Sequence, residues 1–286
     1  MSYTLLDGKA LSATIRAELK RTVAALPSPP RLVVFLSHPH HSSTIYVRNK
    51  LIACKEVGIA TTLIDTPCTT TEELLRLIRP HAHRADVNGL LVQFPLHPDV
   101  DQRHIIEAIP PEKDVDGAHP LNMGKLAMQD PSGFIPCTPL GIQTLLSAHH
   151  IPTRGKHVVI IGRSLTVGKP LALLLSQTGP HADATVTLAN RSTPDLVSLC
   201  RTADIIVAAA GRARLITADM VREGAVVIDV GINRIEIEGK ERLVGDVDFA
   251  TVSPHCSAIT PVPGGVGPMT IASLLSNIVK SYKARS

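Results

Sequence analysis

Hydrophobic residues along the chain form two patterns: short continuous runs, and longer stretches in which apolar positions recur every three or four residues. The first pattern predicts buried strands and the second predicts amphipathic helices. In the first half of the chain the predicted helices are 11–26, 43–57, 71–82 and 102–108, with Thr71 as a candidate N-cap, and the predicted strands are 32–36, 59–64 and 89–93. Strands joined by helices in this way predict a parallel sheet with right-handed crossovers.

A second series of the same kind follows a loop-rich stretch between residues 110 and 139. After a connecting helix at 139–149, the predicted strands are 158–161, 185–188, 205–208 and 225–230, and the predicted helices are 167–177, 195–201 and 270–283. The sequence therefore predicts an α/β fold with two parallel-sheet domains around a cleft. These domains are 1–139 and 140–269, and the helix in 270–286 is expected to pack back on the first domain.

Composition narrows the function classes. The 286 residues are 44% hydrophobic but only 2% aromatic, so aliphatic side chains must fill both cores, as in parallel sheets covered by helices. The net charge of +4 is spread along the chain, which favours an anionic small molecule over nucleic acid. No apolar stretch has the length of a membrane span, and the five cysteines form no C-x-x-C pair. We therefore expect free thiols and a cytoplasmic location.

The predicted strand 158–161 ends in a turn that suits a phosphate group. A glycine lets the backbone turn tightly, and the following helix N-terminus offers unpaired N–H groups and a positive dipole end to a pyrophosphate. The residues concerned are Gly162, Arg163, Ser164, Val167 and Gly168. Because Ser164 stands where a dinucleotide motif has its second glycine, a turn without any ligand is the alternative interpretation.

The next predicted strand is followed by residues that indicate which dinucleotide binds. NAD-binding units tend to carry an acidic residue there for the ribose hydroxyl, whereas this chain has Asn190, Arg191 and Ser192. An arginine and a hydroxyl suit a 2′-phosphate, and Arg163 could reach the same group. A solvated loop arginine is the alternative for Arg191, but the two arginines together favour NADP and a Rossmann-type second domain.

Candidate chemistry in the first domain lies on one helix and at a strand end. Tyr46 and Lys50 are four residues apart on a predicted helix and share a face. Gln93 ends an apolar strand, where its amide needs partners. Asp114 and Asp116 sit in an Asp-Val-Asp-Gly loop, which by default forms a turn but could also bind the N–H groups of a heterocycle.

Histidines are numerous, but their spacing does not favour a metal site. His38, His40 and His41 lie close together, as do two later pairs, yet none has the spacing of a zinc motif. His81 and His83 are expected at a helix C-terminus, where a positive charge is favourable. We therefore expect no bound metal.

Eight segments together resemble one protein family, the bifunctional methylenetetrahydrofolate dehydrogenase/methenyltetrahydrofolate cyclohydrolases. The Asp-Val-Asp-Gly segment and the segment 260–270, Thr-Pro-Val-Pro-Gly-Gly-Val-Gly-Pro-Met-Thr, are the most specific. The matching segments are 46–50, 56–59, 89–96, 111–117, 136–139, 162–170, 227–233 and 260–270. The resemblance therefore covers nearly the whole chain.

The resemblance implies a role for each matching position. Lys50 would be the catalytic lysine, Gln93 its tuning partner, Asp116 the anchor of the pterin ring, and Tyr46 a stacking partner of the folate. The implied NADP contacts are Gly162, Arg163, Ser164, Val167, Gly168, Arg191, Ser192 and Ile232. Pro263, Gly264 and Gly265 would lie beside the nicotinamide and the folate. The family also implies a homodimer.

The implied activity has two steps. NADP would oxidise 5,10-methylenetetrahydrofolate without a general base, because the folate nitrogens stabilise the product cation. Water would then attack the methenyl carbon to give 10-formyltetrahydrofolate, and a lysine beside that cation could exchange the proton at neutral pH. One departure concerns residues 37–43, where the family usually has a glycine after the first strand.

Four alternatives stay open at this point. The chain could be a dehydrogenase that lacks the cyclohydrolase step. Tyr46 and Lys50 also match the short-chain dehydrogenase pair, but that pair follows the glycine-rich turn and here precedes it by more than a hundred residues. A shikimate-type dehydrogenase would not explain Asp116 or the 263–267 loop. A non-catalytic NADP-binding regulator would not explain why Lys50 and Gln93 are both present.

Overall fold

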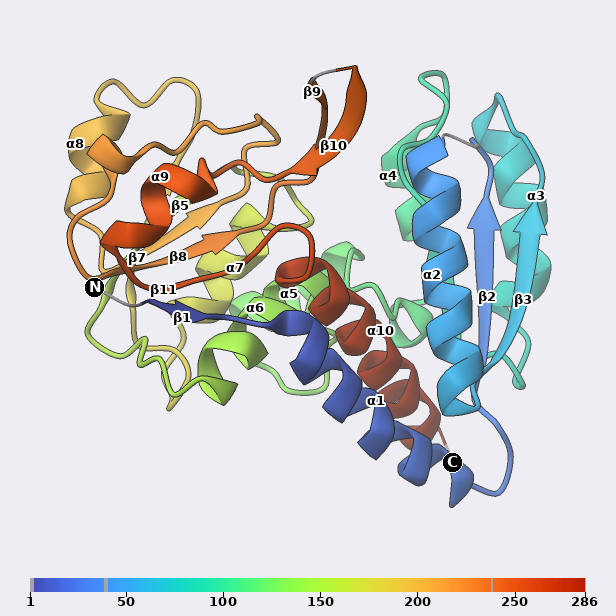
Figure 1. The fold of residues 1–286 in the computed structure, drawn as a ribbon. Coiled ribbons are helices and arrows are strands. Elements are labelled where there is room, and N and C mark those ends of the chain that lie inside the picture. The colour runs from blue at the N-terminus through green and yellow to red at the C-terminus, as the bar shows by residue number, and fades with distance from the viewer. Residues whose placement is uncertain (1–2, 39–40, 238, 286) are drawn as a thin grey trace. The chain divides into compact units, whose positions relative to one another are not determined.

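The computed structural model describes residues 3–38, 41–237 and 239–285. The chain folds into two compact units. Unit 1 comprises the residues up to Ser12 and Thr138–Thr270, and unit 2 comprises Ala13–Cys137 and the residues from Ile271 onward. Each unit is built around its own parallel sheet (Figure 1). The N-terminal residues thus group with the second sheet, whereas the sequence placed them in the first domain.

Unit 2 contains a three-stranded parallel sheet in the order β3-β2-β4. Its strands are β2 (Arg31–Leu36), β3 (Ala60–Asp65) and β4 (Gly89–Val92). The side chains of β2 alternate between two cores because successive residues of a strand point to opposite faces. Val34 packs with α2 (His41–Val57) and α10 (Val266–Lys283), whereas Phe35 packs with α3 (Thr71–Ala82). The central strand is therefore buried on both faces.

Helix α3 begins at Thr71, as predicted, but its N-cap is the residue before the predicted one. Thr70, not Thr71, is the N-cap: its hydroxyl accepts a hydrogen bond from Glu73 N, and the Glu73 carboxylate accepts one from Thr70 N. This reciprocal capping box satisfies two N–H groups that a helix start leaves open. Thr71 has another task, since its hydroxyl accepts a hydrogen bond from Asp101 N at 2.8 Å.

The remaining helices of unit 2 cover the sheet and shape its loops. Leu19 of α1 (Gly8–Ala24) packs in the same core as Leu275 of α10, so these two long helices lie side by side (Figure 1). The shorter elements are α4 (Gln102–Glu107), the 3-10 turn η1 (Pro111–Lys113) and α5 (Pro120–Ala127). Helices α1, α6 (Cys137–Ala148) and α10 each contain residues of both units.

Unit 1 contains a six-stranded parallel sheet in the order β1-β11-β8-β7-β5-β6. The strands are β1 (Thr4–Leu5), β5 (His157–Ile161), β6 (Thr185–Ala189), β7 (Ile205–Ala208), β8 (Ala225–Asp229) and β11 (Cys256–Ile259). From β5 the chain moves to β6 on one side and then crosses to β7 on the other. Such a switch point is where doubly wound sheets bind ligands.

Helices and a hairpin complete unit 1. The helical elements are α7 (Gly168–Leu175), α8 (Leu196–Arg201), η2 (Ala218–Met220), α9 (Phe249–Val252) and η3 (Ser253–His255), and β9 (Asn233–Ile237) pairs with β10 (Lys240–Val244) as an antiparallel hairpin. The α/β class with parallel sheets is confirmed. The sequence did not predict β1, β11, the hairpin or α5. It also started the last helix at 270, whereas α10 begins at Val266.

Candidate active site

Lys50 and Gln93 meet at the carboxyl edge of the unit 2 sheet. Lys50 lies on α2, and Gln93 follows the end of β4. The Lys50 ammonium donates a hydrogen bond to Gln93 Oε1 at 3.0 Å, and Gln93 Nε2 donates to Phe94 O at 2.7 Å. The second bond fixes which end of the amide faces the lysine. Both side chains are half-buried, so they are accessible to a ligand. The structure thus pairs two residues that are 43 positions apart.

Two buried thiols lie near the lysine. Burial raises the pKa of Cys54 to about 12 and raises the pKa of Cys137 well above its ordinary value, and in both cases the charge of Lys50 acts in the opposite direction. Asp116 raises the pKa of Cys137 further. Both thiols are therefore neutral packing groups at neutral pH. Because the charges of Lys50 and Asp116 both act on the pKa of Cys137, these two residues lie in the same part of unit 2.

The two aspartates of the Asp-Val-Asp-Gly loop have different surroundings. Asp114 is buried, and its carboxylate accepts hydrogen bonds from Ala118 N, His119 N and Asn122 Nδ2 at 2.7–3.1 Å. Burial raises the pKa of Asp114, and these hydrogen bonds oppose that rise. Asp116 is half-buried and lies on the same loop. Asp114 therefore holds the loop, and Asp116 is the carboxylate that a ligand can reach.

Asn277 anchors the same loop from α10. Its side-chain amide donates to Val115 O at 2.9 Å and to Ile135 O at 3.1 Å, and only 3% of the residue is exposed. Cys137 N also donates a hydrogen bond to Asp116 O, which links the Asp-Val-Asp-Gly loop to the start of α6. The sequence did not single out Asn277. A polar residue on the apolar face of a predicted helix was the available signal, because its amide needs buried partners.

The glycine turn of unit 1 follows β5. Gly162 has φ +124°, and a Cβ there would overlap Ala209 O. A Cβ on Gly168 would overlap Gly162 O, so the first turn of α7 packs directly on the glycine turn. Ser164 accepts a hydrogen bond from Val167 N, which shapes the approach to the helix. Such a turn leaves room for a phosphate close to the backbone at a helix N-terminus.

Arg191 and Ser192 lie beside that turn. β5 pairs with β6 in the register Ile161↔Ala189, so the residues after the two strands emerge next to each other. Asn190 Oδ1 accepts a hydrogen bond from Ser192 N, and this local turn presents Arg191 and Ser192 on the surface. Arg163 is exposed as well. The arrangement suits the 2′-phosphate of NADP, because cationic and hydroxyl groups replace the usual acid.

The other predicted contacts also belong to unit 1. Ile232 is 43% exposed and follows β8. Pro263, Gly264 and Gly265 lie in the tight turn before α10, where Gly265 N donates to Pro261 O and Gly264 O accepts from Lys9 N. Their predicted roles beside the nicotinamide and the folate remain predictions.

The histidines gather no metal ligands within residues 3–38, 41–237 and 239–285, where no group of three His, Cys, Asp or Glu could hold an ion. His40 of the predicted histidine cluster lies outside the described residues, and so does Pro39 of the departing loop. His81 lies in the last turn of α3 and His83 is its C-cap, as predicted. No helix in the described part of the chain is long and apolar enough to cross a membrane.

Comparison with known proteins gives a consistent result. A family model described as the NAD(P)-binding domain of tetrahydrofolate dehydrogenase/cyclohydrolase matches residues 136–286, and one described as its catalytic domain matches residues 6–116. A "Bifunctional protein FolD" from Nitratidesulfovibrio vulgaris (strain DP4) is 54% identical over 98% of both chains.

Two solved structures agree with these matches. The bifunctional methylenetetrahydrofolate dehydrogenase/cyclohydrolase FolD from Campylobacter jejuni has a TM-score of 0.94 and 48% identity over 100% of both chains. The Trypanosoma brucei enzyme, complexed with NADP cofactor and inhibitor, has a TM-score of 0.94 and 34% identity over 99% of this chain and 98% of that chain.

The doubly wound sheet with its glycine turn, joined to a unit that carries a paired lysine and glutamine, defines a two-domain NAD(P)-binding enzyme. The chain belongs to the tetrahydrofolate dehydrogenase/cyclohydrolase family. The predictions of this family, of the enzyme class and of a nicotinamide dinucleotide as cofactor are thereby confirmed. The short-chain dehydrogenase, shikimate-type and regulator alternatives are excluded.

Proposed function

We propose that this chain oxidises 5,10-methylenetetrahydrofolate with NADP and hydrolyses the product to 10-formyltetrahydrofolate, using Lys50, Gln93, Asp116 and Tyr46 of unit 2. The Lys50–Gln93 hydrogen bond carries the proposal. A half-buried lysine that is hydrogen-bonded to a neutral amide is suited to exchanging a proton near a cationic substrate. The amide fixes the position of the amine and adds no charge of its own beside the substrate.

In the oxidation, NADP supplies the acceptor of the hydride when it is bound. The chain's own residues provide binding and orientation, because the methylene carbon needs no general base to lose a hydride. Asp116 would accept hydrogen bonds from the N–H groups of the pterin ring, and Tyr46 would cover the ring with its own. Tyr46 lies one turn before Lys50 on α2, which places both on one face of the helix.

In the hydrolysis, a water molecule adds to the methenyl carbon, one C–N bond breaks, and a proton is released. The Lys50 amine would accept one proton of the attacking water and pass it to the departing ring nitrogen, while the hydroxyl group of the adduct loses the proton that is released. Gln93 would keep one N–H of the amine engaged, so that the lone pair points away from the amide. Net, the methenyl cation and water give 10-formyltetrahydrofolate and a proton.

In the first test the protein is mixed with 5,10-methenyltetrahydrofolate in the absence of nucleotide. The loss of the near-ultraviolet absorbance of the substrate is then compared with that in a control without enzyme. Accelerated loss supports the cyclohydrolase. Without acceleration, the dehydrogenase-only alternative holds if methylenetetrahydrofolate with NADP still yields NADPH, and the proposal fails entirely if it does not.

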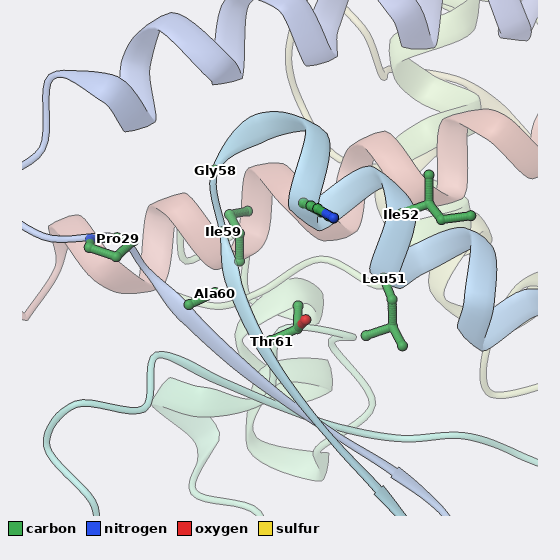
Figure 2. A pocket seen from close by; sticks show the side chains of 8 residues that line it. Pro29, Leu51, Ile52, Gly58, Ile59, Ala60 and Thr61 are labelled. Carbon is green, nitrogen blue, oxygen red and sulfur yellow. The ribbon is translucent and has the colours of Figure 1, made fainter.

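We further propose that the chain is a homodimer that acts in the cytoplasm. β3 is an edge strand of the unit 2 sheet, and edge strands invite pairing with a second chain. Leu63 of β3 and Ile45 and Ile52 of α2 are 41%, 39% and 54% exposed. Next to them, a shallow apolar depression is lined by Leu51, Ile52 and Thr61, among others (Figure 2).

A second copy of this chain fits this surface because an isologous interface uses the same strand edge and the same apolar patch on both partners. Sedimentation velocity of the wild-type protein and of Ile52→Glu tests it. A dimer that becomes a monomer on this substitution supports the proposed surface. A monomeric wild type at micromolar concentration, or a variant that stays dimeric, contradicts it.

A further inference from the structure

Two buried carboxylates stand at the carboxyl edge of the unit 1 sheet, outside the contacts assigned so far. Asp229 ends β8 and is 3% exposed, and Asp246 follows β10 and is 0% exposed. Buried carboxylates of this kind occur only where hydrogen bonds compensate their desolvation. Their partners therefore show what they hold.

Asp246 holds the turn that follows β7. Its Oδ2 accepts hydrogen bonds from two successive backbone N–H groups, Ala210 N at 2.7 Å and Gly211 N at 2.8 Å. Its Oδ1 accepts one from Asn233 Nδ2 at 2.9 Å. The carboxylate thus fixes the direction of the chain at the point where it leaves the strand, through charge-assisted bonds that are stronger than neutral ones.

Asp229 in turn holds Asp246. Asp229 Oδ1 accepts from Asp246 N at 2.9 Å, and Oδ2 accepts from Val247 N at 3.0 Å. Asp229 N donates to Thr260 Oγ1 at 2.7 Å, which links the network to the residue that begins the 260–265 turn. The ends of β7, β8 and β11 are therefore connected through the two carboxylates.

The turn held by Asp246 touches the glycine turn of the nucleotide site. β7 is the neighbour of β5, and Ala209 N donates to Ile161 O at 2.8 Å. Gly162 lies so close to Ala209 and Ala210 that a Cβ on the glycine would overlap Ala209 O. A movement of the 209–211 turn would therefore displace the backbone at which the pyrophosphate is expected.

We propose that Asp246 is a positioning residue for the dinucleotide: by binding Ala210 N and Gly211 N it fixes the turn against which Gly162 packs. The proposal rests on the nucleotide role of the glycine turn. Asp246 acts through the backbone and does not itself contact the cofactor, because both of its oxygens are engaged within the protein. Its loss should weaken NADPH binding and leave the Lys50 site unaffected.

The test compares Asp246→Asn and Asp246→Ala with Asp204→Asn. Asp204 is a matched control because it immediately precedes β7 and so lies at the amino ends of the strands, away from the glycine turn. Its carboxylate accepts a hydrogen bond from His157 N at 2.7 Å and forms an ion pair with Arg222. For each full-length protein we would measure the Kd of NADPH by its fluorescence, the KM for NADP, the nucleotide-free hydrolysis of methenyltetrahydrofolate, and thermal unfolding.

We expect the Kd of NADPH and the KM for NADP to rise about tenfold in Asp246→Asn, which corresponds to the loss of one charge-assisted bond, and further in Asp246→Ala. The rate of nucleotide-free hydrolysis should stay within about twofold of the wild-type rate in Asp246→Asn. A loss of folded protein would instead lower the NADP-dependent oxidation and the hydrolysis equally. Asp204→Asn should change unfolding alone.

The proposal is overturned if Asp246→Asn folds and binds NADPH like the wild type, or if it and Asp204→Asn weaken binding alike. If Asp246→Ala does not fold, Asp246→Asn decides. These results are independent of the cyclohydrolase assignment: a wild type that hydrolyses no methenyltetrahydrofolate defeats the proposed function, whereas the Kd of NADPH still tests Asp246.

Discussion

The two units share the order of three parallel strands but carry different functional groups at the ends of those strands. In each, the chain leaves a strand, forms a neighbour on one side and then crosses to the other, from β2 to β3 and β4 and from β5 to β6 and β7. In unit 2 the groups proposed to act at the carboxyl edge are the side chains of Lys50 and Gln93, which are hydrogen-bonded to each other. In unit 1 they are a backbone turn at Gly162 and exposed arginines around it.

This difference follows from what each unit is proposed to do. A proton transfer needs one titratable group at a defined place, so the lysine is fixed by an amide that is itself fixed by Phe94 O. A dinucleotide needs many weak contacts along its length, and backbone N–H groups supply these without side-chain entropy. Substitutions at the glycine turn of unit 1 should therefore weaken NADP binding and spare the nucleotide-free hydrolysis, whereas substitutions of Lys50 should slow the hydrolysis and spare NADPH binding.

The largest expected effect is at Lys50. Lys50→Met removes the group that is proposed to exchange the proton, so we expect hydrolysis of methenyltetrahydrofolate to fall by about 10²–10⁴-fold. NADPH binding, measured by fluorescence, should remain at the wild-type level. Lys55→Met is the matched control, because Lys55 lies on the same helix but lines the depression at the other end of β3.

Full hydrolysis by Lys50→Met would remove the lysine from the mechanism. Equal losses of hydrolysis in Lys50→Met and Lys55→Met would show that α2 tolerates neither substitution. The contrast between side-chain chemistry in unit 2 and backbone binding in unit 1 would then lose its main support.

The sequence marked the positions of this site through local signals, a lysine four residues after a tyrosine on a helix and a glutamine that ends an apolar strand. The roles predicted for these residues came from the family resemblance, which covers nearly the whole chain. The long periodic segments were predicted with their boundaries close to those observed. Thr70 shows the limit: Thr70 and Thr71 carry the same hydroxyl, and only the backbone angles decide which one caps α3.

What the sequence did not predict depends on contacts between distant segments. β1 is two residues long and exists because it pairs with β11 more than 250 residues later, in the register Thr4↔Ala258. Asn277 and Asp246 have the same character: each is a polar residue whose buried partners come from remote loops. No window of sequence contains both members of such a pair.

The second effect sharpens the contrast within unit 2 itself. In Asp116→Ala we expect the KM for the folate to rise about tenfold to a hundredfold, since hydrogen bonds to a charged group contribute about 1.5–3 kcal/mol. In Asp114→Ala we expect a loss of stability in urea unfolding instead, because Ala118 N, His119 N and Asn122 lose a buried partner. Unchanged folate affinity in Asp116→Ala would contradict its role as anchor.

The third effect concerns the interior of unit 1. Burial raises the folded-state pKa of Asp229 from 3.8 to about 6, and Asp246 is the charged neighbour that adds to the rise. Because the pKa is raised, the group's contribution to stability is fully present below pH 3.8 and is lost as the pH rises through 6. The free energy of unfolding of the wild type relative to Asp229→Asn should therefore fall by about 1–2 kcal/mol between pH 5 and pH 8.

Urea unfolding of both proteins at several pH values measures that difference. The variant keeps every other titratable group, so the comparison isolates Asp229 from the global pH dependence of the fold. A difference that is constant from pH 5 to pH 8 would mean that the Asp229 pKa is not raised in the folded protein.

The smallest expected effect separates contacts of the surface from those of the interior. Arg191 is exposed at the end of β6 and should reach the 2′-phosphate through water-accessible space, where a charge pair contributes about 1 kcal/mol or less. In Arg191→Ala the KM for NADP should therefore rise about fivefold, and it should rise more at low than at high salt. The KM for NAD should stay the same, since NAD lacks the phosphate.

Arg154→Ala, at an exposed arginine after α6, controls for net charge. If Arg191→Ala raises both constants equally, the residue supports the turn rather than the phosphate, and the preference for NADP must come from Arg163 or Ser192.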